Sequence, residues 1–242
     1  MNLFLEAWNY LSDSANWGGP TGIDHRLLQH LWYSFLTVAL SAMIAVPVGL
    51  IIGHTRRGSA VMVGFANAMR ALPTLGLLTF LVLGLGLGLI PPLLALITVG
   101  IPPLLAGAYA GIANVPADVV DASRAMGMTE RQILFRVEVP NAMPVLLGGL
   151  RSATLQVVAT ATIAAYVNLG GLGRYIFDGL GLYRYDLVLV GALLVAILAL
   201  VLDGILAVAV WASSPGMGRL TRTTIIEPPM PVVTEPPKPA VG

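Results

Sequence analysis

The residues whose types and spacing suggest chemistry lie in one polar segment, residues 114–144, of an otherwise apolar chain. Asp118 and Asp121 place negative charge near the positive N-terminal end of a predicted short helix, and Gly127 can adopt the left-handed conformation that ends it. Small and apolar side chains on that helix, Ala122 among them, suit insertion into a groove on a partner protein. The segment therefore predicts docking on another protein, and an ordinary cytoplasmic loop is the alternative.

A second helix is expected directly after the first. Thr129 can cap it, Gln132 three residues later completes a capping box, and Met128 against Ile133 forms a hydrophobic staple. Pro140 disfavours helical geometry at the residue before it, so we expect this helix to stop there. Helix, glycine hinge and helix together predict a rigid hairpin.

Catalytic patterns are absent from the sequence. His25, His30 and His54 fall at predicted span ends on opposite sides of a membrane, so they predict neither a metal site nor a Ser–His pair. The chain contains no GxxxxGK[ST] phosphate-binding motif, so ATP, if it drives the system, must bind to another chain. We therefore expect no enzyme, no metal and no cofactor in this chain. An intramembrane protease or transferase is disfavoured on the same grounds.

Composition gives the setting of the hairpin. Of the 242 residues, 57% are hydrophobic and 10% charged, and the mean hydropathy is +0.84. That is more apolar surface than a soluble domain of this length can bury, so we expect an integral membrane protein in contact with lipid. Glu6 and Asp13 interrupt the N-terminal apolar stretch, so no cleavable signal peptide is expected. The net charge of +1 gives no reason to expect a nucleic-acid partner.

Apolar runs of about 20 residues predict five membrane spans in an all-α polytopic bundle. If the hairpin faces the cytosol, all of the 13 Lys and Arg residues except Arg26, Arg174 and Arg184 lie on the cytosolic side. This bias predicts an N-terminus outside and a C-terminus inside. The expected spans are 31–52, 72–90, 93–113, 152–169 and 187–211.

The predicted organisation has three parts. Residues 1–26 form an extracytoplasmic segment with a short interfacial helix, for which disorder is the alternative. Residues 27–222 form the transmembrane domain, with the polar loop at 114–144. Residues 223–242 form a proline-rich cytosolic tail that we expect to be disordered.

Polar residues inside the spans suggest a second site. Ser152, Gln156 and Thr160 recur every four residues on one side of the fourth span, and Tyr166 follows nearby. A water-filled translocation path explains such a stripe, and hydrogen bonding between helices is the alternative.

One carboxylate lies inside the last predicted span. Asp203 is a few turns from the cytosolic end of that span, where an unpaired charge is costly. A structural ion pair with Arg70 is the favoured interpretation, and a role in transport is the alternative.

The polar segment resembles the EAA signature of ABC-importer permeases. Asp121, Ala122 and Ser123 match its acidic and small triplet, Gly127 its glycine and Pro140 its closing proline. The usual triplet has Glu and Ala where this chain has Asp121 and Ser123, and the spacing is unchanged. The resemblance implies that these five residues couple the permease to a cytosolic ABC ATPase, which binds the ATP and Mg²⁺.

Two further segments, residues 70–76 (RALPTLG) and 168–173 (NLGGLG), are similar to elements of the methionine-type permease fold. Together with the EAA-like segment they resemble permeases of the osmoprotectant group, which import glycine betaine, choline, carnitine or proline, over residues 27–222. The resemblance implies a prokaryotic plasma-membrane complex with a second permease, identical or paralogous, two ATPases and an extracytoplasmic substrate-binding protein. A permease for methionine or another amino acid is the alternative, and an ion-coupled secondary transporter is a more distant one.

Overall fold

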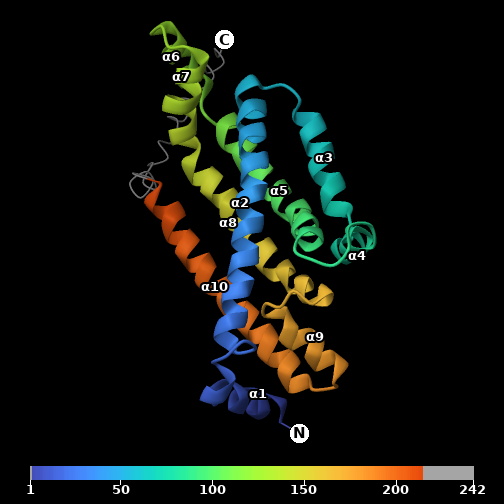
Figure 1. Cartoon of the computed structure of the whole chain (residues 1–242). Helices are drawn as coiled ribbons and strands as arrows, with labels where there is room; N and C mark the ends of the chain where they lie inside the picture. Colours follow the sequence, from blue (N-terminus) through green and yellow to red (C-terminus); the bar gives the residue numbers. More distant parts are fainter. Residues whose placement is uncertain (1, 215–242) are drawn as a thin grey trace, which may run out of the picture.

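The fold is an elongated all-helical bundle, in which one helix, Ile23–Thr55, runs most of the length of the molecule (Figure 1). A computed structural model describes residues 2–214, and no β-strand occurs in that range. Four helical stretches are long and apolar enough to cross a membrane, which confirms the predicted all-α bundle. They are built on α2 (Ile23–Thr55), α5 (Ile90–Ala113), α8 (Val139–Thr160) and α10 (Tyr185–Ala212).

The remaining helices are short. Figure 1 places α1 and α9 near one end of the bundle and α6 with α7 at the opposite end. A helix near the N-terminus is as predicted, whereas its position at a membrane surface stays a prediction. The short elements are α1 (Leu3–Ser12), η1 (Ser14–Asn16), α3 (Ser59–Ala71), α4 (Thr74–Leu85), α6 (Ala117–Ala125), α7 (Glu130–Ile133), the π-helix η2 (Leu134–Glu138), η3 (Ala161–Val167) and α9 (Gly173–Gly181).

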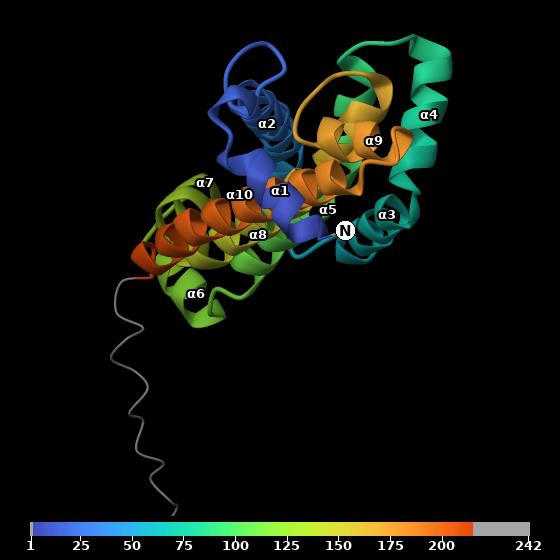
Figure 2. The same cartoon turned by 90° about the horizontal axis from the view of Figure 1, so that it is seen from below.

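Glycines bring the central helices into close contact. A Cβ added at Gly107 of α5 would lie 2.7 Å from the Cα of Gly149 in α8, and one at Gly49 of α2 would lie 2.6 Å from the Cβ of Ala108 in α5. Only a residue without a side chain permits such an approach, so α5 packs directly against both α2 and α8. Seen from below, α3 and α4 lie on the side of the bundle away from the C-terminal end of α10 (Figure 2).

The second predicted span, 72–90, differs from the structure. Instead of one helix there, α3 and α4 form a pair bent by 81°, which is a fifth span only if the pair is counted as one. The 12 residues of α4 reach about 18 Å, less than the roughly 30 Å of hydrocarbon. Proline causes the break, because Pro73 disfavours helical geometry at Leu72, whose backbone is extended.

The fourth predicted span, 152–169, begins too late, and Pro140 does not end the second helix of the hairpin. The helical path continues from α7 through η2 into α8, as a single stretch from Glu130 to Val167. Pro140 lies in the first turn of α8, just after the wide turns of the π-helix η2. These wide turns accommodate the proline ring and its missing N–H, so the chain passes through without a stop.

The predicted spans 93–113 and 187–211 agree with α5 and α10 to within three residues at each end. The predicted span 31–52 lies within α2, which is longer and begins eight residues earlier, at Ile23. The predicted proline-rich tail, 223–242, lies outside the described residues.

Candidate functional site

A glycine cap closes the first helix of the hairpin. Gly127 has a φ of +83°, the left-handed conformation that the sequence predicts. Its N–H donates to the carbonyl of Arg124 over 2.9 Å, and the Met128 N–H donates to the carbonyl of Ser123 over 3.2 Å. This pair of bonds is the Schellman arrangement, which satisfies the last carbonyls of α6 and reverses the chain.

The second helix of the hairpin is capped as predicted. Thr129 Oγ1 accepts from the Gln132 N–H over 3.4 Å, and Gln132 Oε1 accepts from the Thr129 N–H over 2.9 Å. Met128 packs on a small apolar cluster that Ile133 forms with Val115 and Val120. The capping box and the hydrophobic staple therefore fix α7 against α6.

Polar side chains join the hairpin to the end of α2. His54, in the last turn of α2, places Nδ1 2.5 Å from Glu138 Oε2 and Nε2 3.1 Å from Glu130 Oε2. Arg124 donates to both oxygens of Glu130, over 2.8 and 3.1 Å, and to Asp121 over 3.0 Å. Hydrogen bonding to Glu130, and to a smaller extent to Asp121, raises the pKa of Arg124 above its ordinary value, and its guanidinium is charged at any physiological pH.

Sequence reasoning missed His54 and Glu138 as partners. They are 84 residues apart, and neither belongs to a recognisable spacing pattern. The one available signal is Glu138 itself, a carboxylate between Val137 and Val139, which requires a partner when it is buried. Beside these residues lies a cleft of about 290 Å³, lined by His54, Arg56, Ala117, Val120, Asp121, Arg124 and Glu138.

The outer face of α6 is exposed and partly apolar. Met126 is 75% exposed and Val119 39% exposed, and Ala122 and Ala125 are exposed beside them. Ser123 differs from these residues, because it is 4% exposed and donates its hydroxyl to the carbonyl of Val119 over 2.8 Å. Within the triplet, Asp121 and Ala122 therefore face outward, whereas Ser123 is packed against the hairpin.

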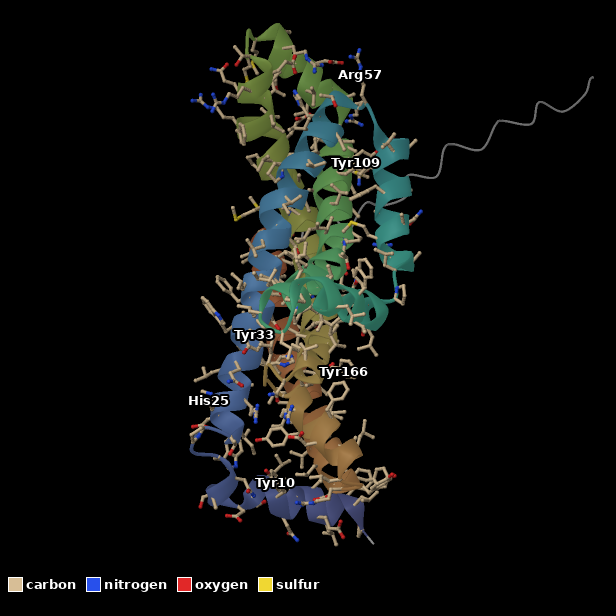
Figure 3. The ribbon with its side chains drawn as sticks, turned by 45° about the vertical axis from the view of Figure 1, so that its right-hand side comes forward. Tyr10, His25, Tyr33, Arg57, Tyr109 and Tyr166 are labelled. Carbon is tan, nitrogen blue, oxygen red and sulfur yellow. The ribbon has the colours of Figure 1, made fainter. Side chains whose placement is uncertain are left out.

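The hairpin and the N-terminal helix lie at opposite ends of the bundle. Figure 3 labels Arg57, which follows α2, at the hairpin end, and Tyr10 and His25 at the other end. This arrangement is compatible with the predicted sidedness, which stays a prediction because the structure contains no membrane.

The polar stripe lies partly on the surface of α8. Ser152 and Gln156 are exposed, Thr160 is half-buried, and Tyr166 in η3 is 54% exposed. Gln156 donates to Ser152 Oγ over 3.2 Å, and Thr154 donates to the carbonyl of Leu150 in the same helix. Among residues 2–214 these bonds stay within α8, so the interhelical alternative gains no support, and the translocation path stays a prediction.

Asp203 pairs with Arg151, and the predicted pair with Arg70 is wrong. Arg151 Nε and a terminal nitrogen donate to the two Asp203 oxygens over 2.6 and 2.7 Å. Arg151 lies on α8, which packs against α10, whereas Arg70 lies in the last turn of α3, which packs against α5. The fourth span is predicted to begin at Ser152, so Arg151 is assigned to the cytosolic side of the membrane. For this reason the sequence does not suggest it as a partner of Asp203.

The N-terminal half of α2 holds the loop at 168–173. Tyr33 donates to the carbonyl of Leu169 over 2.7 Å, and Gln29 Oε1 accepts from the Gly171 N–H over 3.0 Å. His30 is buried with Nε2 2.9 Å from the carbonyl of Val158. These bonds tie α2 to the end of α8.

Residues 45–212 match the model of a protein family described as "Binding-protein-dependent transport system inner membrane component". The match covers both the hairpin and the stripe of α8. The chain belongs to this family of transporter permeases. Membership assigns a multi-pass membrane protein and agrees with the resemblance carried by Asp121, Ala122, Ser123, Gly127 and Pro140.

Individual family members are similar over most of their length. The choline transport system permease protein OpuBB of Bacillus subtilis (strain 168) is 36% identical over 81% of this chain and 91% of its own length. The carnitine transport permease protein OpuCB of Listeria monocytogenes is 38% identical over 74% of this chain and 84% of its own. In the solved structure described as "Inward facing conformations of the MetNI methionine ABC transporter", one chain superposes with a TM-score of 0.70 at 23% identity. That superposition covers 77% of this chain and 94% of the other, and it establishes a shared fold.

Proposed function

We propose that the protein is the transmembrane permease subunit of an ATP-driven importer for a small osmoprotectant such as glycine betaine, choline, carnitine or proline. The observation that carries this proposal is the 36–38% identity to choline and carnitine permeases over most of the chain. A methionine substrate is less well supported. The chain of the methionine transporter shares only 23% identity with this chain, and that similarity supports a common fold but not a common substrate.

The chain works with partners in this proposal. A cytosolic ABC ATPase binds ATP and Mg²⁺, an extracytoplasmic binding protein delivers the substrate, and a second permease subunit completes the path. Such an assembly explains why the chain carries no phosphate-binding motif of its own. Substrate choice is then made mainly by the binding protein, where aromatic rings can hold a quaternary ammonium.

The α6–α7 hairpin is the coupling element of this proposal. Asp121 and Ala122 on the outer face of α6 contact the ATPase, Gly127 and Ser123 fix the shape of the hairpin, and Pro140 lies where the hairpin joins α8. The exposed Val119 and Met126 support this role, because an apolar patch on a short polar helix suits a groove in a partner. The hairpin then faces the cytosol, with the N-terminus outside.

Reconstituted transport tests the function. The permease is placed in liposomes with its ATPase and binding protein, and uptake of labelled choline, carnitine, glycine betaine, proline and methionine is compared with and without ATP. We expect uptake of at least one osmoprotectant that depends on ATP and on both partners. Uptake by the permease alone, driven by an ion gradient, would instead identify a secondary transporter, and ATP-dependent uptake of methionine alone would identify an amino-acid importer.

A further inference from the structure

Helix α2 ends directly beneath the hairpin. It runs from Ile23 at one end of the bundle to Thr55 at the other, and His54 lies in its last turn. Gly53, one residue earlier, is buried against α5, so the end of α2 is held firmly within the bundle. The His54 side chain, which belongs to this turn, therefore moves together with the central helix α2.

His54 is placed between two carboxylates of the hairpin segment. Its Nδ1 lies 2.5 Å from Glu138 of η2 and its Nε2 lies 3.1 Å from Glu130 of α7. Each ring nitrogen of His54 therefore lies within hydrogen-bond distance of a carboxylate, one from η2 and one from α7. The His54 side chain is 13% exposed and that of Glu138 2% exposed, so water screens the shorter contact very little.

Glu138 has no other side-chain partner in the described part of the chain. Within residues 2–214 its carboxylate hydrogen-bonds to His54 alone. A buried carboxylate with one partner is strongly dependent on that partner. Glu138 also ends the π-helical segment that links the hairpin to α8, and π-helical turns inside α-helices often occur at functional sites.

The contacts continue from His54 to the outer face of α6. Glu130 accepts from Arg124 over 2.8 Å, and Arg124 donates to Asp121 over 3.0 Å. Asp121 is 70% exposed beside Ala122. A continuous set of polar contacts thus joins α2 to the face of the hairpin that is proposed to meet the ATPase.

We propose that His54 and Glu138 are positioning residues that clamp the hairpin to α2, so that a movement of the hairpin is transmitted to this helix. The inference rests on the proposed coupling role of α6. Without the clamp, the hairpin still docks on the ATPase, but its movement is absorbed locally instead of moving α2.

The test uses the complete complex of permease, ATPase and binding protein in liposomes. ATP hydrolysis and substrate uptake are measured together for wild type, His54→Ala and Glu138→Gln, with His25→Ala as a control at an exposed histidine of the opposite end. We expect the number of substrate molecules taken up per ATP to fall about tenfold in both clamp variants, the effect of a coupling lost between adjoining groups. The His25→Ala ratio should equal that of wild type.

The double variant His54→Ala/Glu138→Gln separates this role from simple stabilisation. Two residues that act through each other should lower the ratio no further together than either does alone. A structural role would instead lower hydrolysis and uptake in parallel, as intact complex is lost, and leave their ratio unchanged. That result, or a wild-type ratio in His54→Ala, would overturn the clamp.

Glu138→Gln keeps the side-chain volume, so it provides the measurement if His54→Ala does not fold. Failure of the wild-type complex to hydrolyse ATP and take up substrate would count against the proposed function itself and is thereby distinguished from failure of the clamp. Hydrogen exchange gives a second readout, because the clamp predicts faster exchange in residues 117–133 of His54→Ala with α5 and α10 unchanged.

Discussion

The hairpin and the polar stripe of α8 are the two candidate functional regions, and they are held in different ways. In the hairpin, Gly127 caps the C-terminal end of α6, Thr129 and Gln132 cap the N-terminal end of α7, and Arg124 forms an ion pair with Glu130. In the stripe, Ser152 and Gln156 bond to each other and are otherwise exposed. The hairpin is complete within one chain, whereas the stripe presents polar groups that require water or another subunit.

This difference indicates where each region functions. A rigid hairpin that needs no partner to hold its shape can transmit force without unfolding, as a coupling element must. Exposed amides and hydroxyls within a membrane helix are costly against lipid. We therefore expect this part of α8 to face an aqueous path or another subunit.

Changing the hinge of the hairpin should have the largest effect. A Cβ at Gly127 would meet no atom within 4 Å, so Gly127→Val is penalised by backbone conformation alone, by about 1–2 kcal/mol. We expect uptake by the complete complex to fall about tenfold while membrane insertion is unchanged. Gly127→Asn is the matched control, because asparagine tolerates the left-handed region, and it should stay close to wild type. Near-normal uptake by a well-expressed Gly127→Val complex would contradict a rigid hinge.

The exposed face of α6 should respond to added charge. Ala122→Glu places a longer, charged side chain on a surface that is desolvated when the ATPase docks, and we expect association to weaken about fivefold. Binding of purified ATPase to the permease in detergent measures this, with Ala122→Ser as the small control at the same position. Equal affinity for wild type and Ala122→Glu would place the docking surface elsewhere.

The two regions also differ in how far the sequence predicts them. The capping box of Thr129 and Gln132 and the left-handed Gly127 depend on residues within a few positions of each other, so local rules are sufficient. The partners of His54 and Asp203 lie 84 and 52 residues away, and such distances are set by packing between helices. Local rules also failed for Pro140, because a π-helical segment accommodates a proline that would otherwise end the helix.

The ion pair between Arg151 and Asp203 sharpens the comparison, because it adjoins the stripe and joins α8 to α10. Asp203→Ala should lower the temperature at which the detergent-solubilised permease unfolds, since Arg151 then loses its partner within the bundle. The exchanged pair Arg151→Asp/Asp203→Arg should recover part of that loss, and Arg70→Gln should unfold like wild type. Loss of stability in Arg70→Gln equal to that in Asp203→Ala would contradict the pairing described here.

The smallest effects on transport are expected from single cysteine substitutions in the stripe. Their reaction with a thiol reagent measures whether each position is accessible to water. The native chain has no Cys, so Gln156→Cys and Thr160→Cys can be labelled against a clean background with a membrane-impermeant thiol reagent. If the stripe lines a path, both should react, and reactivity should change when the complex is trapped with ATP.

Two controls decide the meaning of that labelling. Leu200→Cys lies on an exposed apolar part of α10, 71% exposed, and should stay unlabelled in a lipid environment because the reactive thiolate does not form readily there. Val157→Cys is buried between helices and should also be inert. If Gln156→Cys and Thr160→Cys are as inert as these controls with and without ATP, the stripe faces lipid or a tightly packed second subunit. The stripe would then differ from the hairpin only in how it is packed and would not line a translocation path. The hairpin alone would remain as a candidate functional site.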